Sequence, residues 1–326
     1  MRRIIKLGTA TLLVGALAGC TAGPAESHTG TTSAAPAELT EVSVSIVPFS
    51  PDAVLFYAME NGIFEKHGLK VTTQNAASPI EVSAALVSGT QQFGFITTPV
   101  LINAALAGTS LKCVTPVAGQ VADKDEESGL VASKASGITS LEGFANKKVA
   151  TVQLGSINRL GMEKLFDDAG VKGVQYVAIP FPQMPQALAD GRVDGAQVSS
   201  PFLDTALKGG AELIMYPNSV VWKNATIYCF AGTGSYLDKN PKVAKAFQDA
   251  MKEAIVYAKD HQDEVLKTLV EHMKLTPEVA AAQSLATNFV PEINVPSIDN
   301  IQKEMKHFDW IKSTVDVGDL VWTAGK

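Results

Sequence analysis

Residues 84–95 read AALVSGTQQFGF, and the pattern of this stretch decides the fold class. Its first half is the end of a predicted helix, Gly89 ends that helix, and a strand is predicted over Phe93–Ile96. The same order recurs in ALADGRVDGAQV at residues 187–198, where Gly191 stands between a helix and a strand. Two copies of one helix–glycine–strand unit indicate two α/β lobes of the same design.

Short strands alternate with helices around both copies. A helix predicted over Ala53–Lys66 is followed by a strand over Leu69–Thr73, and a strand over Lys148–Gln153 by a helix over Asn158–Asp168. After residue 220 the pattern becomes mainly helical. This alternation favours parallel sheets with helices on both faces. One continuous sheet is the alternative to two lobes.

The N-terminal residues predict export. Residues 1–19 have a basic start and an apolar run over Leu7–Leu17 that is shorter than the roughly 20 residues of a membrane-spanning helix. The ending Leu17–Cys20 resembles the bacterial lipobox, which implies cleavage before Cys20 and a diacylglycerol on its sulfur. The alternative is an ordinary signal peptide. Residues 20–40 are small and polar, and we expect a lipidated flexible tether there.

The composition narrows the classes of function. With 33 acidic and 27 basic residues the chain is mildly acidic, and no basic patch points to nucleic acid. Besides Cys20 there are Cys113 and Cys229, whose spacing matches no zinc or redox motif. Both lie in predicted strands. If those strands are neighbours, the two cysteines could form a disulfide; the alternative is two buried thiols.

Five predicted helix starts share one chemistry. A hydroxyl residue at the N-cap follows a predicted strand in each, and four of them have proline next. In open α/β sheets ligands bind beyond the carboxyl ends of strands, where helix N-termini offer free N–H groups and partial positive charge. We expect these helix starts to line a cleft between the lobes. The alternative, for each start taken alone, is a hydroxyl that only caps its helix. The five hydroxyl residues are Ser50, Ser78, Thr98, Ser156 and Ser200.

Four stretches, in order, resemble motifs of the nitrate/sulfonate/taurine-binding proteins of ABC importers. That family also includes binders of thiamine pyrimidine precursors and related pyrimidine-synthesising enzymes. Ser200 and Gln92 depart from its motifs, which often have an acidic residue and an aspartate there. The stretches are AMENGIFEKHGLKV (58–71), AALVSGTQQFGF (84–95), SGITSLEGFANKKVAT (136–151) and ALADGRVDGAQVSSPF (187–202).

The resemblance implies an α/β type II periplasmic-binding-protein fold, two lobes joined by two hinge crossovers. We place the crossovers near Lys134–Gly137 and Asn224–Tyr228. Lobe 1 then comprises residues 41–135 plus 227–326, and lobe 2 residues 136–226. The implied protein is a monomeric extracytoplasmic lipoprotein, anchored to the cell membrane through Cys20, that passes a small solute to an ABC permease and its ATPase. It is not an enzyme and needs no cofactor or metal.

The motifs also imply a ligand site. We expect a sulfonate, taurine or nitrate-like solute, with Arg159 in direct charge contact. A pyrimidine thiamine precursor, with Phe49 stacked on the ring and Asp52 on its amino group, is the alternative ligand. A pyrimidine-synthesising enzyme and a ligand-sensing subunit of a signalling system are the alternative functions. The expected site residues are Phe49, Ser50, Asp52, Ser78, Thr97, Thr98, Gly155, Ser156, Asn158, Arg159, Gln183, Ser199 and Ser200.

Overall fold

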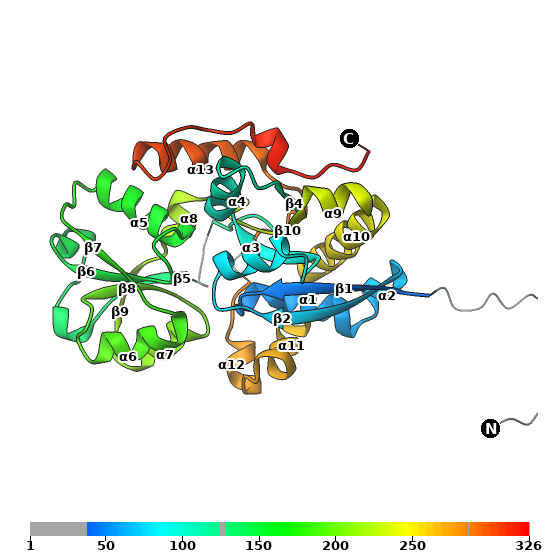
Figure 1. The fold of residues 1–326 in the computed structure, drawn as a ribbon. Coiled ribbons are helices and arrows are strands. Elements are labelled where there is room, and N and C mark those ends of the chain that lie inside the picture. Colours follow the sequence, from blue (N-terminus) through cyan, green and yellow to red (C-terminus); the bar gives the residue numbers. More distant parts are fainter. Residues whose placement is uncertain (1–37, 124–127, 286, 326) are drawn as a thin grey trace, which may run out of the picture. The chain divides into compact units, whose positions relative to one another are not determined.

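The first of two sheets joins four strands of the N-terminal part of the chain with β10, which follows the second sheet in sequence (Figure 1). A computed structural model describes residues 38–325 except 124–127 and 286. Five strands form this sheet in the order β2-β1-β3-β10-β4, and β10 runs antiparallel to both of its neighbours. The bounds are β1 Thr40–Ile46, β2 Leu69–Asn75, β3 Phe93–Thr97, β4 Leu111–Pro116 and β10 Tyr228–Thr233.

The second sheet repeats this plan. Its order is β7-β6-β8-β5-β9, so that an antiparallel strand, β5, again occupies the fourth place. The repeat confirms the predicted fold class of two α/β lobes. The bounds are β5 Ser128–Ala132, β6 Lys148–Thr151, β7 Gln175–Ala178, β8 Gly195–Ser199 and β9 Glu212–Met215.

Helices follow the strands and cover the sheets. In the second sheet, α5 and α8 lie on one face and α6 and α7 on the other (Figure 1). The helices are α1 Ala53–Glu60, α2 Ile63–Lys66, α3 Pro79–Val87, α4 Thr98–Leu106, α5 Ile157–Asp168, α6 Met184–Ala189, α7 Phe202–Lys208, α8 Pro217–Val221, α9 Gly234–Lys239, α10 Pro241–Ala258, α11 Gln262–Met273, α12 Pro277–Ala281 and α13 Val295–His307. Within the described residues, no helix is long and apolar enough to cross a bilayer.

Apolar side chains gather in three clusters. The largest surrounds the first sheet, where the rings of Phe93 and Phe247 stack with centroids 4.1 Å apart. Two smaller clusters occupy the two faces of the second sheet. Ile157 and Leu160 of α5 belong to the largest cluster, although α5 follows a strand of the second sheet. The first turns of α5 therefore pack against the first lobe.

Strand β5 corrects one predicted boundary. The predicted lobe 1 includes residues 41–135, but β5 pairs with β8 and β9 of the second sheet. All five of its residues are buried, so both of its edges and faces need partners, and the second sheet provides them. The chain thus crosses between sheets after β4, ahead of the predicted Lys134–Gly137. It returns between α8 and β10. The remaining lobe boundaries stay a prediction.

The two crossing segments pair with each other. Val121 donates its N–H to Ala225 O, and Asn224 donates to Val121 O, each at 3.0 Å. Thr287 forms an antiparallel bridge with Val121 on the other side. Three segments thus run together at the crossing point. The predicted signal peptide, Cys20 and nearly all of the tether lie outside the described residues, and β1 begins at Thr40.

Cys113 and Cys229 lie on neighbouring strands, as the disulfide hypothesis requires. Both are buried free thiols, and burial raises the pKa of Cys113, with the Cys229 thiol in hydrogen-bond contact adding to the rise. The register pairs Cys113 with Ala231, so the cysteines are diagonal rather than opposite. The strand register shifts between Phe230 and Ala231, and the two thiols lie in contact. The disulfide itself stays a prediction.

Candidate ligand-binding cleft

A cleft lies at the carboxyl ends of strands from both sheets, and the empty space in and around it, open solvent included, is about 400 Å³. Five of the expected site residues line it. Phe49 and Thr97 come from the first lobe, and Ser156, Asn158 and Ser199 from the second. Among the described residues that line it, none is charged. The complete lining is Val47, Phe49, Pro79, Phe95, Thr97, Val152, Ser156, Ile157, Asn158, Phe181, Ser199 and Tyr228.

Aromatic rings form one wall of the cleft. Phe49 meets Phe95 edge-on with centroids 4.9 Å apart, and meets Tyr228 at 5.3 Å. The Tyr228 hydroxyl donates to Asn158 Oδ1 at 3.4 Å, which joins the two lobes across the cleft. Edge-to-face packing fixes the orientation of such rings, so the wall is preformed.

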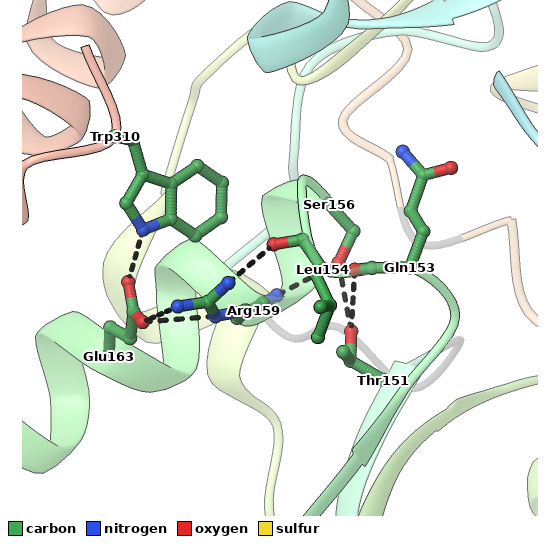
Figure 2. A network of polar contacts seen from close by, with 7 residues as sticks. All are labelled: Thr151, Gln153, Leu154, Ser156, Arg159, Glu163 and Trp310. Atoms are coloured by element: carbon green, nitrogen blue, oxygen red, sulfur yellow. Dashed lines mark hydrogen bonds and ion pairs between the residues drawn. The ribbon is translucent and has the colours of Figure 1, made fainter. Parts of the chain in front are cut away.

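Helix N-termini supply the polar groups. Ser156 caps α5: its Oγ accepts the N–H of Arg159 at 3.1 Å and lies 2.8 Å from Thr151 Oγ1 (Figure 2). Ser78 caps α3 by accepting the N–H of Glu81 at 3.4 Å. Two of the five predicted caps are thereby confirmed. The first N–H groups of a helix lack partners within it and carry partial positive charge.

The other three predicted caps are wrong. Thr98 lies inside α4, where its hydroxyl donates to Thr226 O at 2.8 Å, and Thr97 is the N-cap. Ser50 lies inside a 3-10 helix and donates to Gln283 Oε1 at 2.8 Å. Ser200 is buried one residue before Pro201, the N-cap of α7. The hydroxyls of Thr98 and Ser50 bond to distant acceptors instead of capping a helix. At Ser200 the helix begins one residue later than the pattern predicts.

Thr97 is the hydroxyl most available to a ligand. Its side chain makes no capping bond, and Thr97 Oγ1 is buried without a hydrogen-bond partner within the part of the chain that the structure describes. The same holds for both amide atoms of Gln153, a residue that the motifs did not indicate and that follows Val152 of the lining. Its side chain extends away from α5 in Figure 2. Buried groups left without partners are commonly found where a ligand or water completes the site.

Asp52 does not line the cleft. It is fully buried behind Phe49, whose N–H it accepts through Oδ2 at 3.2 Å, while Oδ1 has no partner in the described residues. Burial raises the pKa of the Asp52 carboxyl well above 3.8, and the hydrogen bond from Phe49 opposes this in part. The Asp52 carboxyl thus holds the backbone of a lining residue.

An Asp52→Asn variant should be more stable than the parent at neutral pH. Its amide oxygen can accept the same N–H without a buried charge. Because the pKa of Asp52 is raised in the folded state, the stability that its proton provides is complete below pH ~4 and is lost as pH rises towards the folded pKa, by at most about 1.4 kcal/mol per pH unit. Urea unfolding of both proteins from pH 4 to 8 measures this. A difference in unfolding free energy that is constant with pH contradicts it.

Arg159 points away from the cleft. Its guanidinium pairs with Glu163 Oε1 at 2.6 Å and donates to Leu154 O at 2.9 Å (Figure 2). It also lies over the rings of Tyr176 and Trp310, 5.0 and 4.9 Å from their centroids. The arginine expected to contact an anion is therefore already paired.

The remaining expected residues lie at the edge of the site. Gly155 is in the turn before α5, and Gln183 is exposed at the end of a 3-10 helix whose first residue, Phe181, lines the cleft. Sequence reasoning missed Phe181 and Tyr228. Tyr228 lies in the predicted crossover Asn224–Tyr228. Because the two lobes meet at a crossover, this position could have indicated a residue of the cleft.

The family follows from a comparison over most of the chain. The sequence profile of the NMT1-like family matches residues 35–272, well over half of the length. The chain belongs to the NMT1-like family. A search of the curated proteins gave no match.

Solved structures share the fold of this NMT1-like protein. The ligand-binding component of an ABC-type import system from Staphylococcus aureus, solved with zinc bound, superposes with a TM-score of 0.75 at 18% identity, over 87% of this chain and 96% of that one. The aliphatic sulphonate-binding protein SsuA of Escherichia coli gives 0.72 at 18%, over 88% and 93%. The nitrate-binding protein NrtA of Synechocystis PCC 6803 gives 0.73 at 16%, over 86% and 84%. These likenesses support the two-lobed periplasmic-binding fold.

Proposed function

We propose that this protein is the extracytoplasmic solute receptor of an ABC importer, anchored through Cys20. The observation that carries the proposal is the cleft, whose walls come from both sheets and whose hydroxyl, amide and aromatic groups converge at strand ends. Solved structures of the same fold include the ligand-binding component of an ABC-type import system and a periplasmic aliphatic sulphonate-binding protein. Closure of two lobes around a solute would present the loaded form to a permease.

The ligand we propose is a small organic sulfonate. Residues at the starts of α3, α4 and α5 line the cleft, and the partial positive charge of a helix N-terminus suits an oxyanion head. The aromatic wall around Phe49 suits an apolar body, which nitrate lacks. Taurine also has an ammonium group, and no acidic side chain is among the described residues of the lining; Asp52 is fully buried outside it.

A neutral pyrimidine is the second candidate. Two observations favour it: no charged side chain is among the described residues of the lining, and Arg159 is paired with Glu163. The open donor and acceptor of Gln153 also match the edge of an amino-pyrimidine.

Thermal unfolding in the presence of candidate solutes tests the function. A bound solute at 100 times its Kd stabilises the folded state by about 2.7 kcal/mol, so a true ligand raises the Tm by several degrees. The panel comprises benzenesulfonate, butanesulfonate, taurine, nitrate and 4-amino-5-hydroxymethyl-2-methylpyrimidine. We expect the two organic sulfonates to raise the Tm most. A panel without any shift, confirmed by calorimetry, contradicts the ligand assignments, and a catalysed change in a bound compound contradicts the receptor function.

A further inference from the structure

Helix α5 belongs to both lobes. Met162 and Phe166 pack into a cluster on the second sheet, whereas Ile157 and Leu160 pack into the large cluster around the first sheet. Its first turn also lines the cleft. Whatever fixes α5 against the first lobe therefore fixes one wall of the cleft.

The C-terminal segment holds α5 from the first lobe. Ile301 and Met305 of α13 are buried in the large cluster, and just beyond this helix Trp310 donates its indole N–H to Glu163 Oε2 at 2.7 Å. Lys164 and Glu304 add a weaker ion pair at 3.9 Å. The contacts join residues far apart in sequence, and Figure 2 shows Trp310 lying over α5.

Glu163 connects Trp310 to the turn before α5 through a chain of hydrogen bonds that includes Arg159. Its Oε1 accepts from Arg159 Nε at 3.0 Å and from Nη2 at 2.6 Å, while Nη1 of the same guanidinium donates to Leu154 O (Figure 2). The side chains of Arg159 and Glu163 are only 24% and 14% exposed, so their pairing is less screened than that of a surface pair. The rings of Tyr176 and Trp310 further restrict the guanidinium.

We propose that Trp310, Glu163 and Arg159 form an interlobe clamp that positions the first turn of α5, and with it Ser156 and Asn158, in the ligand cleft. The clamp deepens the proposed function and rests on it for its purpose. Arg159 is a positioning residue in this scheme, because it acts through Leu154 and Glu163. A site held by buried, hydrogen-bonded neighbours keeps its geometry without the ligand.

Hydrogen exchange of the ligand-free full chain tests the clamp. The amides of Ser156, Arg159 and Leu160 are protected by Gln153 O, Ser156 Oγ and Ser156 O respectively. Losing a hydrogen bond to a charged group typically costs enough to speed exchange about tenfold or more. We expect such acceleration at these amides in Trp310→Phe and in Glu163→Gln, with the larger effect in Glu163→Gln because the single amide oxygen cannot accept from both the indole and the guanidinium.

Matched controls separate the clamp from general loss of packing. Trp322→Phe trims a buried indole beside Cys113 of β4, and Asp249→Asn removes another i,i+4 ion pair, with Lys245. Both controls should leave exchange at the α5 turn unchanged. Unchanged exchange there in the folded clamp variants, or equal acceleration in Trp322→Phe, overturns the proposal. The readout needs no solute, so failure of the clamp is distinct from failure of the receptor function.

Discussion

A Cys20→Ala variant should lose its lipid anchor. The Leu17–Cys20 ending resembles a lipobox, in which the cysteine sulfur forms the thioether to diacylglycerol. Alanine has no atom that can replace the sulfur. Two acyl chains bind a bilayer stably, since each buried CH₂ contributes about 0.8 kcal/mol, and their loss removes the whole anchor. The variant should be secreted or remain as uncleaved precursor.

Cell fractionation with immunoblotting measures this outcome, and Cys113→Ala is the matched control. That variant loses a cysteine of the first sheet and keeps Cys20, so it should fractionate with membranes like the parent. A Cys20→Ala protein that is processed to the mature size and still pellets with membranes would contradict the anchor. This experiment tests the membrane anchor and does not test the ligand-binding cleft.

The parts of the fold that follow local rules were predictable. Gly89 and Gly191 both end helices in the left-handed conformation, at φ of 75° and 65°, and a strand follows each after a few residues. Glycine adopts this conformation without steric cost, which is why the pattern was informative. Ser78 and Ser156 cap their helices because the hydroxyl and the N–H that it accepts are three residues apart.

The parts that depend on distant partners were not predictable. Arg159 carries the expected charge, but its role is set by Trp310, which reaches α5 through the packing of α13. Ser50 has the capping pattern, yet its hydroxyl donates to Gln283. The placement of β5 depends on its pairing with β8 and β9, which no residue of β5 reveals alone. Sequence motifs indicated five residues of the candidate cleft, whereas long-range contacts decided which other side chains line it.

A Thr97→Val variant should distinguish the two ligand classes. Valine matches threonine in shape and lacks only the hydroxyl, and Thr97 Oγ1 has no hydrogen-bond partner in the described ligand-free chain. The substitution should therefore leave the Tm unchanged or slightly raised. A hydrogen bond to a charged group is worth about 1.5–3 kcal/mol and one to a neutral group about 0.5–1.5 kcal/mol. Affinity should fall roughly ten- to hundredfold for a sulfonate and less than about tenfold for a pyrimidine.

Thr98→Val is the control next to it in sequence. The Thr98 hydroxyl donates to Thr226 O at 2.8 Å, and Thr98 does not line the cleft. This variant should lose about 1–3 kcal/mol of stability, because a buried carbonyl is left without its donor, and should keep its affinity. Calorimetry with the solute that gives the largest Tm shift, run beside thermal unfolding, separates the two effects. If Thr97→Val binds as tightly as the parent while Thr98→Val binds weakly, the ligand lies deeper than the cleft and reaches the crossing segments instead.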